Sequence, residues 1–278
     1  MPWAPELFSV PALQHLEEKL GPQLETVPFF DGLMAGEFDA LVGSFAGEPE
    51  LHHPVRGRIR GERAFLAYVK DTLAWLEQRN IVVEDVERVI VGRRGLGEAV
   101  LQLDGENGRI ELPVALVADR QSDGRIEELR MYYSTWPFTG RHANRPPLMQ
   151  PDGEVRESDV VGEYQRALAA GDIGAIVATF EPDGYAREPA GAQYIHRGQD
   201  GLRAFYDLLF SNDGGIPLEH CNVIDNKRTC ALEYNVVRWG KTELQPQAGV
   251  AVYVRGESGK LAAARIYDDV NPPLDSQR

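Results

Sequence analysis

Apolar residues in the second half of the chain recur first at helical spacing and then at strand spacing. Three helices are predicted: over 159–170, over the stretch that begins at the N-cap residue Asp172, and over 199–210. The "EPDG" stretch at 181–184 is expected to turn the chain into a short strand that ends at Glu188. The later predicted strands are 218–224, 229–239, 249–255 and 261–270. This order predicts an α+β unit in which three helices cover a curved antiparallel sheet.

The first half of the chain repeats the second at an offset of 135 residues. Identical residues occur in register near the start of the unit and again at its end. The matching pairs are Leu33/Leu168, Ala35/Ala170, Gly36/Gly171, Ala40/Ala175, Val42/Val177, Phe45/Phe180 and Pro54/Pro189, then Gly124/Gly259, Arg130/Arg265 and Tyr132/Tyr267. Because the same offset aligns both the start and the end of the unit, the sequence indicates a tandem duplication with two units of the same architecture.

Proline-rich and polar stretches mark the expected boundaries of these units. They give an N-terminal extension with a short amphipathic helix at 1–26, a first domain at 27–138, a linker at 139–158, a second domain at 159–272 and a tail at 273–278.

The composition limits the classes of partner. A net charge of −14 argues against a nucleic-acid partner and against docking on an anionic membrane. No run of about 18 apolar residues predicts a membrane-spanning helix, and the N-terminus lacks the basic and apolar regions of a signal peptide. Cys221 and Cys230 are too few for a disulfide framework and are expected to be small buried hydrophobes. A cytoplasmic location is therefore expected.

Strand alternation assigns the residues of the last strand to two faces. Ala264, Ile266 and Asp268 share one face, and Arg265 and Tyr267 share the outer one, where the first unit has Arg130 and Tyr132. The outer residues are either solvated or paired, since long amphipathic side chains cover sheet surface, or they form the seam of a sheet-to-sheet internal pseudo-dimer. Homodimerisation through the outer sheet stays open.

The stretch "GYAREPAG" places Glu188 directly before Pro189. Alternation puts Glu188 on the face of Ala186 and opposite to Arg187. Glu188 is therefore either a strand-end carboxylate paired with Arg187 or Arg203, or a carboxylate that faces a pocket. The first unit keeps the proline as Pro54 and has His53 in the place of Glu188.

Four stretches of the second unit together resemble a known family: "EYQRALAAGDIGAIV", the acid-Pro-Ala-Gly segment, "RGQDGLRAFY" and "SGKLAAARIYDDV". The chain resembles the ketosteroid isomerase and SnoaL-like polyketide cyclase branch of the NTF2-like superfamily. The resemblance spans 159–272, and 27–138 matches less well. It implies two tandem cystatin-like cones, and this fold hosts enzymes and binding modules alike.

The resemblance also implies roles for individual residues. Glu188 takes the place of the catalytic carboxylate, Tyr164 that of the oxyanion-binding tyrosine, and Tyr206 that of a second tyrosine which hydrogen-bonds the first. Two positions depart from the family, because Ala251 replaces its neutral acid and Asp268 replaces a pocket aromatic. A second carboxylate suits an acid/base task other than steroid isomerisation. The residues expected to line the pocket are Phe205, Tyr206, Tyr234, Phe180, Leu232, Ile266 and Trp239.

Each of these assignments has a structural alternative. Tyr164 could equally be a core tyrosine with a satisfied hydroxyl group, and Asp268 a solvated residue at a strand end. In the first unit the equivalent pocket positions hold Phe29, His53 and Tyr133, so its pocket is expected to be degenerate. No metal is expected there, because adjacent histidines on a strand face opposite sides.

The function expected from the resemblance is general acid/base isomerisation or cyclisation of a small hydrophobic, oxygenated, polyketide-like molecule without a cofactor. Glu188 would be the base, Tyr164 the oxyanion donor and Asp268 a second acid/base. One alternative is a non-catalytic module that binds a hydrophobic ligand or a protein partner. Another is epoxide opening, because a tandem pair of such units also resembles the polyether-forming epoxide hydrolase/cyclases, whose pockets use two carboxyl groups.

Overall fold

The computed structural model describes residues 28–106 and 108–274, so the predicted N-terminal helix lies outside the described residues. The chain forms two compact units, Met1–Tyr132 and Tyr133–Arg278. The expected linker groups with the second unit. Its backbone carbonyls at Arg145 and Met149 accept hydrogen bonds from Ala248 N at 2.9 Å and Asn235 Nδ2 at 3.1 Å. Among the described residues, no helix has the length and apolar character needed to span a membrane.

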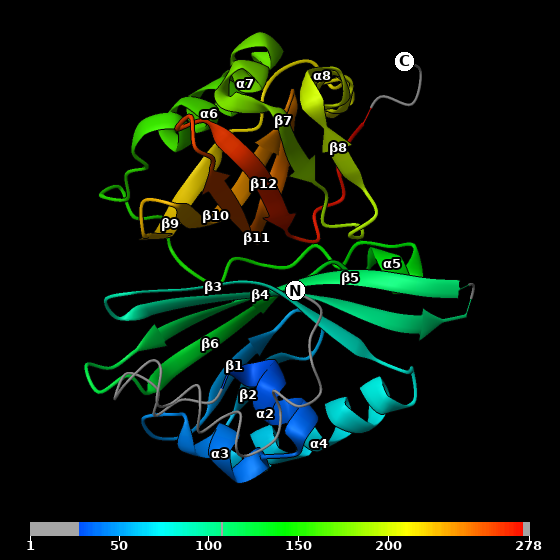
Figure 1. Cartoon of the computed structure of the whole chain (residues 1–278), viewed down its shortest axis with the longest axis vertical. Coiled ribbons are helices and arrows are strands. Elements are labelled where there is room, and N and C mark those ends of the chain that lie inside the picture. The colour runs from blue at the N-terminus through cyan, green and yellow to red at the C-terminus, as the bar shows by residue number, and fades with distance from the viewer. Residues whose placement is uncertain (1–27, 107, 275–278) are drawn as a thin grey trace. The chain divides into compact units, whose positions relative to one another are not determined.

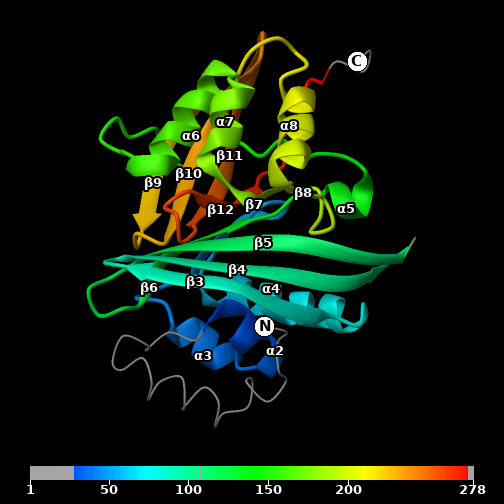
Figure 2. The ribbon, with the colours of Figure 1, turned by 45° about the horizontal axis from the view of Figure 1, so that its top comes forward.

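The three longer helices of the second unit pack on one face of its six-stranded sheet (Figures 1 and 2). After the short helix α5 (Trp136–Thr139), its elements are α6 (Asp159–Ala170), α7 (Ile173–Thr179), β7 (Phe180–Arg187), β8 (Ile195–Arg197), α8 (Gly198–Leu209), β9 (Leu218–Asp225), β10 (Thr229–Trp239), β11 (Thr242–Arg255) and β12 (Leu261–Tyr267). The strand order is β8-β7-β12-β11-β10-β9.

The first unit has the same strand order, β2-β1-β6-β5-β4-β3. Its elements are α2 (Phe29–Ala35), α3 (Phe38–Gly43), β1 (Glu50–His53), β2 (Gly57–Arg60), α4 (Glu62–Glu77), β3 (Val82–Val91), β4 (Arg94–Gly105), β5 (Gly108–Arg120) and β6 (Ile126–Tyr132). Two sheets with one topology fit the predicted tandem duplication of α+β units.

Each sheet is mixed, whereas a wholly antiparallel sheet was expected. β7 pairs with β12 in parallel, as β1 does with β6. Consecutive strands joined by hairpins run in opposite directions, but the members of these pairs are not consecutive, because a helix and four strands separate them along the chain. The "EPDG" stretch was also expected to be a turn, but it lies inside β7. Parallel pairing brings the carboxyl ends of β7 and β12 to the same edge of the sheet.

The ends of α6 and α7 follow from their sequences. Gly171 ends α6 with a φ of 71°, which glycine adopts without strain. Asp172 then caps α7 by accepting a hydrogen bond from Ala175 N at 2.9 Å, as the sequence predicts. Both helices and α8 bury their apolar faces against the same side of the sheet, in one continuous core.

Register fixes which side chains face this core. Ala186 on β7 lies opposite Ala264 on β12, and Ala264 lies opposite Tyr253 on β11. On the outer face, Arg265 and Tyr267 are buried, so the solvated interpretation of this pair is wrong. The guanidinium of Arg187 lies 4.8 Å from the centre of the Tyr267 ring, which is a cation–π arrangement.

Candidate functional site

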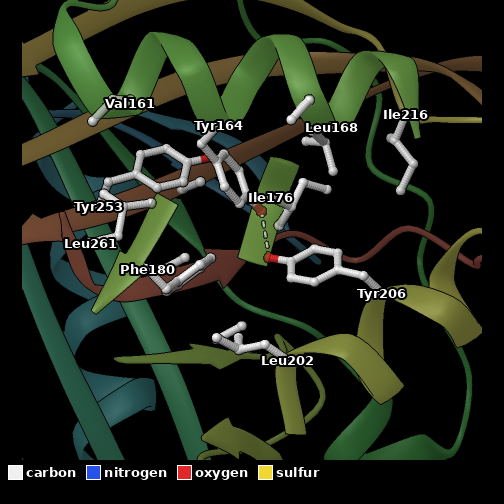
Figure 3. Packing of buried hydrophobic residues seen from close by; sticks show 14 of the residues in the cluster. Val161, Tyr164, Leu168, Ile176, Phe180, Leu202, Tyr206, Ile216, Tyr253 and Leu261 are labelled. Carbon is white, nitrogen blue, oxygen red and sulfur yellow. Dashed lines mark hydrogen bonds between the residues drawn. The ribbon is translucent and has the colours of Figure 1, made fainter. Parts of the chain in front are cut away.

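Two buried tyrosines hydrogen-bond each other between the helices of the second unit (Figure 3). Tyr164 comes from α6 and Tyr206 from α8, and their hydroxyl oxygens are 2.8 Å apart, as the family resemblance implies. Burial raises the pKa of Tyr164 to about 12 and that of Tyr206 well above its usual value, so both hydroxyls keep their protons near neutral pH. Since one hydroxyl donates to the other, the pair has one further proton to donate.

Asp268 lies directly after β12 and is buried, with only 8% of its surface exposed. Its Oδ2 accepts a hydrogen bond from Tyr234 Oη at 2.9 Å, and its Oδ1 accepts a longer one from Val270 N at 3.4 Å. Burial raises the pKa of Asp268 to about 6 despite the hydrogen bond from Tyr234. The solvated alternative for Asp268 is therefore wrong, and the group can hold or release a proton near neutral pH.

A glycine allows Tyr234 to make this contact. Gly249 on β11 lies opposite Tyr234 on β10, and the tyrosine ring crosses over it toward Asp268. A Cβ atom at position 249 would come within 2.6 Å of the ring. Gly249 is thus a close-approach glycine that sets the position of the tyrosine hydroxyl.

Glu188 follows β7 and bonds a residue that the sequence analysis did not select. Its Oε1 lies 2.6 Å from Nε2 of His196 on β8, and the two side chains are 32% and 29% exposed. The His196 ring stacks on Phe205 with 4.1 Å between centroids and 9° between planes. Among the described residues Glu188 does not pair with Arg187 or Arg203, so the predicted arginine partners are wrong.

The Glu188–His196 pair and the Tyr164–Tyr206 pair both contact helix α8. Phe205 contacts His196, and it also meets Tyr206 edge-on with ring centroids 5.0 Å apart. In the described structure Glu188 and Tyr164 are thus connected through Phe205 and Tyr206, and no hydrogen bond joins them directly. Asp268 lies at the same sheet edge as Glu188, because β7 and β12 are parallel and each residue directly follows its strand.

The remaining predicted lining residues occupy different depths. Phe180 and Leu232 are fully buried, and Phe180 meets Tyr164 edge-on with centroids 5.9 Å apart. Ile266 is half-buried and packs against the same core. Trp239 is also half-buried, and its Nε1 donates to Leu209 O at 2.7 Å, which ties β10 to the end of α8.

The equivalent positions of the first unit lack this polar set. Phe29 has no hydroxyl group and stacks against Tyr68 at 6.5 Å between centroids. His53 uses Nδ1 to accept hydrogen bonds from Val55 N and Arg56 N, at 3.1 and 3.0 Å. Tyr133, expected in the first unit, lies half-buried directly after β6 and is the first residue of the second compact unit.

One group in the first unit has the composition of a metal site. Donor atoms of Glu50, His52 and Glu128 lie within 4.8 Å of one another. Arg58, however, already binds both oxygens of Glu50, at 2.6 and 2.8 Å. Arg130 binds Glu128 at 2.7 Å, and hydrogen bonds from His52 and Arg130 lower the pKa of Glu128 to about 2. The carboxylates are therefore committed to an ion-pair network, which does not fit a metal ion.

Comparison with known proteins matches the second unit to one domain family. The sequence profile of the SnoaL-like domain matches residues 161–264. Solved structures similar to the chain include a cystatin-fold protein of Novosphingobium aromaticivorans, at 18% identity over 38% of this chain and 93% of that chain, with a TM-score of 0.34. A putative polyketide cyclase from Sinorhizobium meliloti has 17% identity, with 40% and 94% covered and a TM-score of 0.34.

A third similar structure is the epoxide hydrolase/cyclase-like enzyme of pyran ring formation in the polyether salinomycin. It has 14% identity, with 46% of this chain and 95% of that chain covered and a TM-score of 0.33. No curated protein matches the chain.

Proposed function

The second unit of the chain carries a SnoaL-like domain, and on that premise we propose that it is a cofactor-independent acid/base enzyme. It isomerises or cyclises a small hydrophobic, oxygenated, polyketide-like substrate. The observation that carries the proposal is Asp268, a buried carboxyl group with a pKa of about 6, fixed by Tyr234 and Val270 N. A group with a pKa near working pH serves as both acid and base.

The tyrosine pair supplies the electrophilic part of this chemistry. Removal of a proton next to a carbonyl group places negative charge on the carbonyl oxygen. Tyr164 and Tyr206 are held in position by their own hydrogen bond and by close packing, and they retain one proton for such an oxygen. A preorganised donor in a dry site stabilises the enolate more strongly than water does.

Glu188 supplies the second carboxyl group, at the same edge of the sheet as Asp268. Its partial exposure supports a position where the substrate enters, while Asp268 is enclosed by the core. Two carboxyl groups in different environments suit separate acid and base roles. This pairing also favours epoxide opening as a second candidate, with Asp268 as the acid toward the epoxide oxygen and Glu188 as the base toward the attacking hydroxyl group.

Isotope exchange separates these candidates. The full chain is incubated in D₂O with β-tetralone, and deuterium entry at the carbon next to the carbonyl is followed by NMR; an epoxy alcohol is tested in parallel for ring closure. The proposal expects exchange or closure that falls in Asp268→Asn and in Glu188→Gln. Equal rates in the wild type and both variants would contradict it. Ligand binding without turnover in any form would favour a binding module.

A further inference from the structure

His196 lies beside Glu188 in the sheet, although the sequence pattern did not indicate it as a site residue. The β7–β8 pairing places His196 opposite Ala186, whose side chain is buried in the helix-covered core. Glu188 follows Ala186 by two residues and shares its face, so the two side chains are diagonal neighbours. The sequence alone could not show this, because the loop between the strands leaves their register undefined.

Two contacts fix the imidazole ring of His196. Phe205 holds one face of the ring in a parallel stack at 4.1 Å, and Glu188 Oε1 holds Nε2 at 2.6 Å. A carboxylate only accepts hydrogen bonds, so Nε2 must carry the proton of the neutral ring. The lone pair then lies on Nδ1. In the part of the chain that the structure describes, Nδ1 of His196 has no hydrogen-bond partner, and the side chain is 29% exposed.

Other histidine–carboxylate pairs of the same unit are built differently. His142 contacts Asp269, which is 2% exposed and also accepts hydrogen bonds from Ser134 Oγ, Thr135 Oγ1 and Ala143 N. His220 contacts Glu157, whose side chain is 9% exposed. Their buried carboxylates tie segments of the unit together. The Glu188–His196 pair is instead partly exposed, and in the described structure its imidazole ring makes one hydrogen bond only.

We propose that His196 is the catalytic base of the second unit and that Glu188 is its positioning residue. The proposal rests on the acid/base function above and refines it, because the basicity of Glu188 acts through the imidazole ring. Nδ1 takes a proton from the carbon next to a carbonyl group, or from a hydroxyl group. The C–H electron pair moves into the enolate, Glu188 stabilises the imidazolium, and the same proton returns to product at another carbon. The substrate class is a carbonyl compound with an acidic C–H group or an attacking hydroxyl group that can reach Nδ1.

The tautomer of His196 is the first test, and it needs no substrate. Long-range ¹H–¹⁵N NMR on the ¹⁵N-histidine-labelled full chain distinguishes the two neutral tautomers, and the signal is assigned by its loss in His196→Gln. The proposal expects the Nε2–H form in the wild type. Glu188→Gln is not diagnostic here, because its amide group can accept a hydrogen bond from Nε2 or donate one to it. A wild-type ring in the Nδ1–H form would overturn the proposal.

A carbon-acid probe tests the base itself. Nitrobenzisoxazole is a flat aromatic compound that loses its ring C–H proton to a base while its N–O bond breaks, which gives a coloured phenolate. The wild type should open it faster than free imidazole at the same concentration, and His196→Gln should lower the rate at least about tenfold. His220→Gln is the matched control and should retain the wild-type rate. Equal rates in His196→Gln and wild type, or a wild type no faster than imidazole, would contradict the assignment.

The two tests keep this inference separate from the proposed function. An Nε2–H tautomer and a fast probe reaction, together with no conversion of any ketone or epoxide, would leave the base in place and remove the proposed reaction. Ketone exchange that persists in His196→Gln but is lost in Asp268→Asn would support the proposed reaction and remove His196 as its base.

Discussion

The two units fold alike but place different chemistry at equivalent positions. Where the second unit has Tyr164 bonded to Tyr206, the first has Phe29 stacked on Tyr68. Both sheets nevertheless have the same strand order and the same parallel pair. The fold therefore does not require the buried hydroxyl of Tyr164. Among its described residues, the first unit has no hydroxyl pair at this position, since Tyr68 contacts Met131 Sδ at 3.9 Å instead.

The residue before the shared proline shows the same difference. His53 in the first unit turns Nδ1 back toward its own backbone, where two N–H groups occupy it. Glu188 in the second unit turns to His196 instead. A side chain that closes its own turn has no lone pair left on that nitrogen for a substrate, whereas the Glu188–His196 pair leaves Nδ1 open. The difference supports the proposal that the reactive site lies in the second unit.

The largest expected effect is on turnover. Asp268→Asn removes the carboxyl group that titrates near neutral pH while it keeps the shape of the side chain. The rate of ketone exchange or epoxide closure should fall about 100- to 10,000-fold, the usual contribution of a general acid/base. Asp200→Asn, at an exposed position on α8, is the control and should retain the rate. A change in rate of twofold or less in Asp268→Asn would show that this carboxyl group takes no part in turnover. The second unit would then not differ from the first in this acid/base chemistry.

The pH dependence of stability is the next effect in size. The pKa of Asp268 is raised from 3.8 to about 6 in the folded chain, so folding favours the protonated form. This stabilisation is complete below the unfolded pKa and is lost as pH rises through the folded pKa. Between about pH 3 and pH 7 the wild type should lose about 3 kcal/mol of unfolding free energy relative to Asp268→Asn. Urea unfolding across this range measures the difference, and parallel curves for the two proteins would contradict the burial of an ionisable group.

A pair of glycine substitutions compares the two sheets directly. Gly249→Ala forces a methyl group into the Tyr234 ring and should destabilise the chain by about 1–3 kcal/mol. It should also detach the tyrosine hydroxyl from Asp268. Gly97→Ala in β4 of the first unit meets no atom within 4 Å and should change stability by less than about 0.5 kcal/mol. Equal effects in chemical denaturation would show that Tyr234 does not depend on the glycine.

The smallest effect concerns the tyrosine pair. Tyr164→Phe makes this position resemble Phe29 of the first unit, but it leaves the Tyr206 hydroxyl buried without its partner. The expected cost is about 1 kcal/mol of unfolding free energy. The double variant Tyr164→Phe/Tyr206→Phe should recover part of this cost, because no orphaned hydroxyl remains. A double variant whose loss equals the sum of the two single losses would indicate that the hydroxyls do not interact.

Periodic patterns predicted much of this architecture. The helix at 159–170 and the strand at 229–239 have their predicted bounds, because each carries a regular pattern bounded by turn residues. The parallel β7–β12 pair and the short strand β8 were missed. Their formation depends on contacts between segments far apart in the chain, which local periodicity does not encode.

The sequence predicted those contacts of the candidate site that follow from residue type. It did not predict the contacts that depend on how the strands pair. The Tyr164–Tyr206 hydrogen bond followed from the family resemblance. The Glu188–His196 contact requires the β7–β8 register, and the Tyr234–Asp268 contact requires a glycine opposite the tyrosine. Both arise only when the sheet forms.

The titration of Asp268 tests the proposed acid/base role most directly. Carbon-13 NMR of the aspartate side-chain carboxyl groups in the full chain, with Asp268→Asn to assign the signal, gives its midpoint in the folded protein. We expect a midpoint near 6, set by burial in the core of the second unit. A midpoint near the ordinary value of 3.8 would contradict it.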